Sequence, residues 1–294
     1  HPSSVFANER VNPRPIDGAL LELARSVVTH GVNGGCPYRA GRDLLLRHPP
    51  RGTSGGGVPL RQPDEPAIDA AIRLAQELDH GVLPIQGPPG SGKTFIGARM
   101  IVELMRQGKR VGVTAVSHKV IRNLLDEVLR AAEERCIDLS ATHKVSGSGL
   151  GAAPGLTEVK KNELALAALA SGHVVGGTSW LWARDDMVEQ ADYLFVDEAG
   201  QMSLAVTLGA SRAAKNLVLL GDPQQLEQPQ RGAHPEGAEV AALVHALDGR
   251  KTIADDRMIV CKEHSDLRHG TSLRARAGSN RGILPQSERP CQNP

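Results

Sequence analysis

The stretch "VLPIQGPPGSGKTFIGARM", residues 82–100, decides the fold of this chain. Its first five residues form an apolar run that predicts a buried strand, and the residues from Phe95 onward carry apolar side chains at helical spacing. Between them, residues 87–94 match the pattern G-x-x-x-x-G-K-[ST], which binds phosphate when it joins a strand to a helix. The stretch therefore predicts a P-loop, and the alternative is a glycine- and proline-rich turn that binds nothing.

The residue types of this loop suit a phosphate anion. Glycines allow backbone N–H groups to converge on phosphate oxygens, and the following helix directs its positive end at the same anion. We expect Lys93 to reach the β- and γ-phosphates, where it would assist catalysis, and the Thr94 hydroxyl to bind Mg²⁺. The expected nucleotide-binding residues of the loop are Gly87, Pro88, Pro89, Gly90, Ser91, Gly92, Lys93 and Thr94.

The rest of the chain predicts an α/β fold in which helices cover both faces of a parallel sheet. Short apolar runs of the kind found in buried parallel strands alternate with amphipathic stretches, and this alternation is typical of such sheets. Further strands are expected at 110–116, 173–179, 193–196 and 217–220, and helices at 16–28, 67–78, 95–108, 117–134 and 163–172. The small residues at 145–155 predict a loop.

Composition divides the chain into three segments. Residues 1–65 hold one helical candidate and glycine- and proline-rich connections, so we expect a linker or the edge of an upstream region. Residues 66–257 carry the strand–helix alternation and form the expected domain. Residues 258–294 lack apolar periodicity and predict a poorly ordered tail. Because the chain opens without Met, we expect a fragment of a longer protein.

The overall composition excludes few functions. Lys and Arg total 34 against 33 acidic residues, and this balance argues neither for nor against nucleic acid. Aromatic residues make up 2% of the chain, so any surface that stacks on bases must be small. No apolar run is long enough to span a membrane. The four cysteines lack a C-x-x-C pair, which argues against a zinc ribbon or a disulfide framework and favours a cytoplasmic protein.

Two adjacent carboxylates follow a predicted strand in "YLFVDE", residues 193–198. We expect Asp197 to hold Mg²⁺, and Glu198 to activate the attacking water as the catalytic base. A kinase that phosphorylates a small-molecule hydroxyl does not need this water-activating neighbour. The alternative is a solvated turn at the end of a strand.

A third polar element follows the strand in "LVLLGDPQQLEQP", residues 217–229. The neutral amide of Gln225 can hydrogen-bond the γ-phosphate without competing for the metal. It can therefore report whether that phosphate is present, and we assign it to both nucleotide binding and catalysis. The alternative is an ordinary polar turn.

Together, "QGPPGSGKT", "VDEAGQ" and "GDPQQL" resemble motifs I, II and III of superfamily 1 helicases of the 5′-to-3′ branch. The resemblance covers about residues 43–257 and is strongest to the helicase half of bacterial RecB-like nuclease–helicase fusions. It implies a P-loop NTPase fold of the RecA-like type, the first of two motor domains, with ATP and Mg²⁺ as cofactors. It also implies that Gln201 contributes to nucleotide handling by coupling motif II to motif III.

The same resemblance implies contacts with a nucleic-acid strand. "TAVSHK" is similar to motif Ia and places Ser117 and His118 on the strand backbone, with Lys119 beside them. Thr178 in "GGTSW" matches motif Ic. From the residues alone, 117–134 reads equally as an ordinary capped helix whose first N–H groups can bind phosphate. Trp180 and its neighbour Trp182 either stack on a base or pack beneath the loop, and His143 and Lys144 are expected at the surface.

The resemblance implies an ATP-hydrolysing helicase motor that acts on single-stranded nucleic acid, with DNA favoured over RNA. Relatives of this kind carry a second RecA-like domain, which supplies arginines to the γ-phosphate, and an upstream nuclease region. We therefore expect this chain to bind Mg-ATP, to hydrolyse it slowly and not to unwind strands unaided. The alternatives are an ATP-dependent clamp on single strands without turnover, and a gene remnant without function. A GTPase is disfavoured because no N-K-x-D guanine signature is present.

Overall fold

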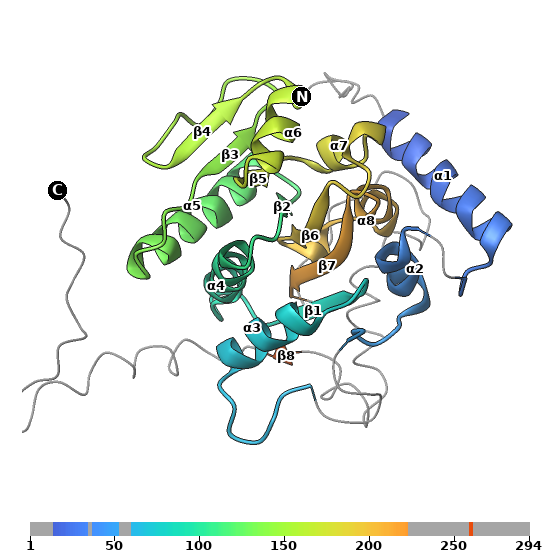
Figure 1. Cartoon of the computed structure of the whole chain (residues 1–294), viewed down its shortest axis with the longest axis horizontal. Helices are drawn as coiled ribbons and strands as arrows, with labels where there is room; N and C mark the ends of the chain where they lie inside the picture. The colour runs from blue at the N-terminus through green and yellow to red at the C-terminus, as the bar shows by residue number, and fades with distance from the viewer. Residues whose placement is uncertain (1–13, 35–36, 53–59, 223–258, 261–294) are drawn as a thin grey trace, which may run out of the picture.

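The computed structural model describes residues 14–34, 37–52, 60–222 and 259–260. Figure 1 shows these residues as a central sheet with helices on both sides. The helices are α1 (Arg14–His30), α2 (Arg39–Leu46), α3 (Ala67–Glu77), α4 (Lys93–Arg106), α5 (His118–Glu134), α6 (Asn162–Ala170), α7 (Ser179–Trp182) and α8 (Leu204–Ser211), with the short 3₁₀ turns η1 (Asp185–Met187) and η2 (Ala199–Gln201).

The described strands form one parallel sheet in the order β4-β3-β5-β2-β6-β7-β1-β8. The carboxyl ends of parallel strands meet at one edge, so the loops that follow β1, β2, β5, β6 and β7 emerge there together. The strands are β1 (Val82–Gln86), β2 (Val111–Thr114), β3 (Ala141–Lys144), β4 (Leu156–Val159), β5 (Val174–Gly176), β6 (Ala191–Val196), β7 (Ala214–Gly221) and β8 (Ile259–Val260).

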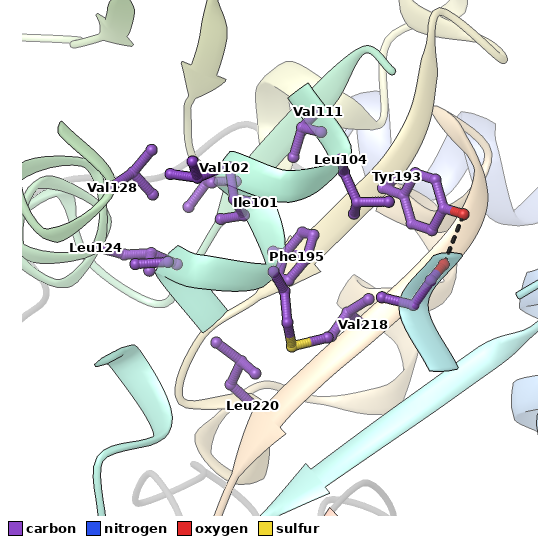
Figure 2. Close-up of a cluster of buried hydrophobic side chains, with 14 of the residues drawn as sticks. Ile101, Val102, Leu104, Val111, Leu124, Val128, Tyr193, Phe195, Val218 and Leu220 are labelled. Carbon is purple, nitrogen blue, oxygen red and sulfur yellow. Dashed lines mark hydrogen bonds between the residues drawn. The ribbon is translucent and has the colours of Figure 1, made fainter. Parts of the chain in front are cut away.

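Both faces of the sheet are covered by apolar side chains. Side chains along a strand point alternately to opposite faces, and β6 follows this rule. Phe195 belongs to the cluster that the sheet forms with α3, α4 and α5, whereas Leu194 belongs to the cluster that it forms with α1, α2, α6, α7 and α8. Figure 2 shows the first of these clusters, which includes Leu104, Val128 and Phe195. The hydroxyl of Tyr193 donates to the Ala75 carbonyl, 2.8 Å away, which ties α3 to the sheet.

The structure confirms the predicted fold class and the core strands and helices from 67 to 221. It also contains elements that the sequence did not predict, among them the helices α2, α7 and α8. β3 and β4, on either side of the predicted 145–155 loop, were not expected, because their short runs mix polar and apolar residues. Within 1–65, α1 packs on α8 and α2 on β7. Within 258–294, the two residues of β8 pair with β1.

Trp182 is a core residue. Its side chain is fully buried, and its Nε1 donates to the carbonyls of Val113 and Gly177, each at 3.1 Å. The indole lies against Gly112 of β2, where a Cβ atom would come within 2.4 Å of the ring. Of the two possibilities that the sequence left open for this residue, packing is therefore the one that the structure shows.

Two smaller features complete the fold. Among the described residues, no helix is long and apolar enough to cross a membrane. Cys136, just after α5, is disulfide-bonded, which the scattered spacing of the cysteines did not predict.

The contact between Gly112 and Trp182 predicts the effect of a substitution. Gly112→Ala should lower the free energy of unfolding by about 1–3 kcal/mol, because the added methyl overlaps a ring that cannot move within the core. Gly18→Ala in α1 is the matched control: nothing lies within 4 Å of that site, so the change should be neutral or slightly stabilising. Urea denaturation of both variants measures this, and equal effects would contradict the assignment.

Candidate nucleotide and strand-binding site

The loop at residues 87–94 joins β1 to α4, as the sequence predicted. Gly90 and Gly92 have φ angles of 77° and 86°, in the left-handed region that only glycine adopts without strain. Gly92 caps α4, and its carbonyl accepts the first helical hydrogen bond from the Ile96 amide at 2.9 Å. The amino end of a 14-residue helix therefore faces the concave side of the loop, which is the arrangement that attracts phosphate.

Lys93 and Ser91 place polar atoms in this loop. The Lys93 ammonium donates to the carbonyls of Gly87 at 2.6 Å and Pro88 at 2.8 Å, so the loop itself holds the cation over its opening. The Ser91 side chain is buried, and its hydroxyl has no hydrogen-bond partner. A buried polar atom of this kind ordinarily finds a partner, and a phosphate oxygen in the loop would supply one.

Asp197 follows β6 at the same edge of the sheet. Its backbone N–H donates to the Thr114 carbonyl at the end of β2, 2.9 Å away, and its carboxyl is almost fully buried. Burial raises the pKa of this carboxyl to about 6. A hydrogen bond from the Glu198 amide and the charge of Lys93 act against that rise, whereas the charge of Glu198 adds to it. The carboxyl thus lies within electrostatic reach of the P-loop lysine.

Glu198 adopts a backbone conformation that is uncommon for its type. Its φ of 52° lies in the left-handed region, where a side chain with a Cβ is strained, and such strain is often stored at functional sites. The turn is held because the Glu198 amide donates to the Asp197 carboxylate at 2.9 Å, and the Gln201 amide to the Glu198 carbonyl at 2.9 Å. Asp197 is consequently buried while the adjacent Glu198 stays partly exposed.

Close backbone contacts join the three predicted motifs. The Gly87 amide donates to the Gly221 carbonyl at 3.2 Å, which fixes the start of the P-loop against the end of β7. At Gly200, a Cβ atom would come within 2.8 Å of the Asp222 carbonyl, so only glycine allows the turn after Glu198 to approach β7 this closely. Gln225, the predicted γ-phosphate contact, lies outside the described residues.

The side chains at this edge fit a magnesium ion. Mg²⁺ prefers hard oxygen ligands and usually takes one or two from the protein and the rest from phosphate and water. Thr94, in the first turn of α4, would contribute a hydroxyl and Asp197 a carboxylate. Within the part of the chain that the structure describes, no group of three or more His, Cys, Asp or Glu side chains could hold a metal by itself. A metal held by these two oxygen donors would take its remaining ligands from a nucleotide and water.

The residues predicted to contact single-stranded nucleic acid follow two neighbouring β-strands of the sheet, β2 and β5. Ser117 caps α5, where its hydroxyl accepts from the Val120 amide at 3.3 Å, and Lys119 is exposed in the next turn. Thr178 stands at the N-cap position of α7 without a side-chain capping bond, and Trp180 is 37% exposed. The structure thus brings the predicted residues to the edge of the sheet that also carries the P-loop.

His143 lies elsewhere than expected. The sequence placed it at the surface, whereas it is fully buried in β3, with its Nε2 3.1 Å from Nδ1 of His118. Because β3 was not predicted, its pairing with β5 and the cover provided by α5 could not be anticipated. The run "ATHKV" carries little signal for a strand, because three polar residues separate its two apolar ones.

The parallel sheet and the loop between β1 and α4 place the chain in the P-loop NTPase fold class. A family model described as an AAA domain matches residues 69–248, and the chain belongs to this family.

Its sequence is similar to those of DNA replication ATP-dependent helicase/nucleases named DNA2. The Saccharomyces cerevisiae protein is 34% identical over 194 residues, which are 65% of this chain and 11% of that protein. The Mus musculus protein is 27% identical over 181 residues, which are 57% of this chain and 16% of that protein. This likeness confirms the resemblance to superfamily 1 helicases, whereas the likeness to RecB-like fusions stays a prediction.

Solved structures of helicases also align with the chain. The UvsW helicase of bacteriophage T4 is 11% identical, with a TM-score of 0.40, over 76% of this chain and 66% of that one. The arterivirus nonstructural protein 10 helicase, solved with DNA, is 16% identical, with a TM-score of 0.36, over 56% of this chain and 34% of that one.

The burial of Asp197 predicts how stability depends on pH. The pKa of its carboxyl rises from 3.8 to about 6 on folding, so the folded state holds the proton more tightly, and stability falls as the pH rises between these values. Asp197→Asn should therefore stabilise the nucleotide-free protein by about 2–3 kcal/mol above pH ~6, and this difference should fade towards pH ~4. Urea denaturation across that range tests it. A difference that does not change with pH would contradict it.

Proposed function

We propose that this chain is the first motor domain of a helicase and that it binds and hydrolyses ATP with Mg²⁺ at the loop 87–94. The proposal depends on one observation: Lys93 of the P-loop and the buried Asp197 lie at the same edge of the sheet, and the charge of Lys93 acts on the Asp197 carboxyl. The similarity to proteins named ATP-dependent helicase/nuclease supports the same function.

Each residue at this edge has a role in the proposal. The loop 87–94, through its backbone N–H groups, and the Lys93 ammonium bind the β- and γ-phosphates. Thr94 and Asp197 would hold the metal, which would neutralise phosphate charge. Glu198, partly exposed beside Asp197, takes the proton of the attacking water. Gln201 and Gln225 link this site to the motif after β7.

The proposed substrate of the motor is single-stranded DNA. Ser117, His118 and Lys119 at the start of α5 would bind its phosphates, and Thr178 and Trp180 would contact the next nucleotides from α7. A hydrogen-bonding contact of 3.5 Å between Thr114 and Ser179 links the two segments. DNA is proposed over RNA because the relatives are named DNA replication proteins.

The chain spans about a tenth of the length of the Saccharomyces cerevisiae relative. We propose that the helicase motor also requires a second RecA-like domain, and that full-length relatives carry an upstream nuclease region. The arginines of a second motor domain would then accelerate a hydrolysis that is slow in this chain, because an arginine finger contributes about 10³–10⁵ in rate. A cytoplasmic location is proposed with this function, although the disulfide at Cys136 stands against a reducing compartment.

Two substitutions separate nucleotide binding from hydrolysis. Lys93→Ala should abolish binding of Mg-ATP, since it removes the cation that faces the phosphates. Glu198→Gln should retain binding and lower the hydrolysis rate by about 10²–10⁴-fold, because the amide cannot accept the proton of water. Isothermal calorimetry and phosphate release measure the two quantities.

The matched control for both is Lys109→Ala, which removes a lysine from the turn between α4 and β2, at the amino end of the sheet. No ATP uptake by the wild-type protein would refute the proposal. ATP uptake without any hydrolysis, with or without single-stranded DNA, would instead favour an ATP-dependent clamp.

The exposed indole of Trp180 provides a test of strand binding. Trp180→Ala should weaken binding of a single-stranded oligonucleotide by about 1–3 kcal/mol, the contribution of one aromatic ring stacked on a base. Leu164→Ala on α6 removes an exposed apolar side chain of similar accessibility and should have no effect. Fluorescence anisotropy measures both, and equal affinities for the two variants would exclude a stacking role.

A further inference from the structure

Three polar side chains from three elements form a cluster beside the proposed strand-binding edge, in which His143 is fully buried and His118 and Glu158 are partly buried. His118 begins α5, His143 lies at the end of β3, and Glu158 is its direct partner on β4. His118 Nδ1 and His143 Nε2 are 3.1 Å apart, and His143 Nδ1 lies 4.0 Å from the Glu158 carboxylate. We refer to these three residues as the histidine cluster.

The position of His143 selects its tautomer. His143 Nδ1 is buried without a hydrogen-bond partner, and the nearest charged group is the Glu158 carboxylate. A proton on Nδ1 is attracted by that carboxylate, whereas a lone pair there is repelled by it. The proton of neutral His143 therefore resides on Nδ1, and its Nε2 is an acceptor. Glu158 is held in place by the Leu150 amide at 2.8 Å and by Arg122.

The tautomer of His143 in turn fixes that of His118. Because His143 Nε2 accepts, His118 Nδ1 must donate across the 3.1 Å contact. His118 is partly exposed. A neutral imidazole carries one N–H, so the Nε2 of His118 then presents a lone pair. A lone pair repels a phosphate oxygen. Only protonated His118 presents an N–H at Nε2 while it keeps its bond to His143.

We infer that His143 is a positioning residue that makes His118 a proton-dependent phosphate contact, so that single-strand binding is coupled to the uptake of one proton. The inference rests on the proposed function, since it takes the phosphodiester backbone as the ligand of His118. It extends that function in two ways: it assigns a role to the buried His143, and it makes the affinity for single-stranded DNA depend on pH.

Burial and the neighbouring charges determine the protonation of the two histidines in the absence of DNA. Burial lowers the pKa of His118, Lys144 on β3 lowers it further, and Glu158 acts against this. Burial, His118 and Arg122 lower the pKa of His143 to about 4, against the effects of Glu158 and Asp126. Both rings thus favour the neutral form, and a first proton goes to His118 because it is the less buried ring. A bound phosphate stabilises that proton, so affinity rises as the pH falls.

The test measures single-strand affinity against pH at constant ionic strength, by fluorescence anisotropy of a labelled oligonucleotide. The wild-type protein should gain up to about tenfold in affinity per pH unit between pH ~8 and pH ~6, the limit for one coupled proton. His118→Gln should flatten this dependence. His173→Gln is the matched control, because that ring bonds to Thr142, whose side chain points to the opposite face of the sheet from His143, and it should keep the full dependence.

His143→Leu separates positioning from simple structural support. Without the acceptor, neutral His118 is free to carry its proton on Nε2, so affinity at pH ~8 should rise severalfold and the pH dependence should weaken. A purely structural role of His143 predicts a loss of affinity that is the same at every pH, and that result would overturn the inference.

Nitrogen-15 spectra of labelled histidines in the wild-type protein report the tautomers directly, without DNA and without a variant that could misfold. Neutral His118 with its proton on Nδ1 supports the inference, and a proton on Nε2 overturns it. Failure to bind strands at any pH would refute the proposed function. Binding that does not vary with pH would refute the inference alone.

Discussion

The parallel pairing of the central strands is the constraint on which the rest of the structure depends. Parallel strands bonded side by side bring their carboxyl ends to one edge, and the chain must then return to the other edge before each new strand, in most cases through a helix that covers a face of the sheet. Gly87, Thr114, Asp197 and Gly221 follow or end four neighbouring strands and meet through backbone hydrogen bonds. Residues more than a hundred positions apart thereby share one site.

The site at this edge lowers the stability of the nucleotide-free protein. A carboxylate that is buried at the end of β6 has its pKa raised to about 6, so part of the folding free energy goes into holding Asp197 ready. The strained turn at Glu198 and the close approach at Gly200 add to this cost. Such features persist because a rigid sheet holds them, and they suit a site whose charge is completed by a ligand.

The same edge continues beyond the nucleotide site through β2, β5 and β3. Here the first residues of α5 and α7 carry the proposed contacts with single-stranded DNA, and the histidine cluster includes His118, the first residue of α5. Since both functions use the ends of adjacent strands, a change at the nucleotide can reach the strand contacts through β2, whose last residue bonds to Asp197 and contacts Ser179. This short path is the physical basis for coupling in the proposed motor.

The sequence by itself determined the P-loop, the strand that carries Asp197 and Glu198, and the strand before Asp222, because these depend on local patterns: glycines at fixed spacing and continuous apolar runs. Only the tertiary structure decided the rest. The strands at Ala141–Lys144 and Leu156–Val159 are too short and too polar to be predicted, and pairing within the sheet makes them strands. The same pairing buries His143 against His118. Trp182 is a core residue because its ring packs against Gly112, seventy residues away. Such a contact between distant residues cannot be predicted from the local sequence.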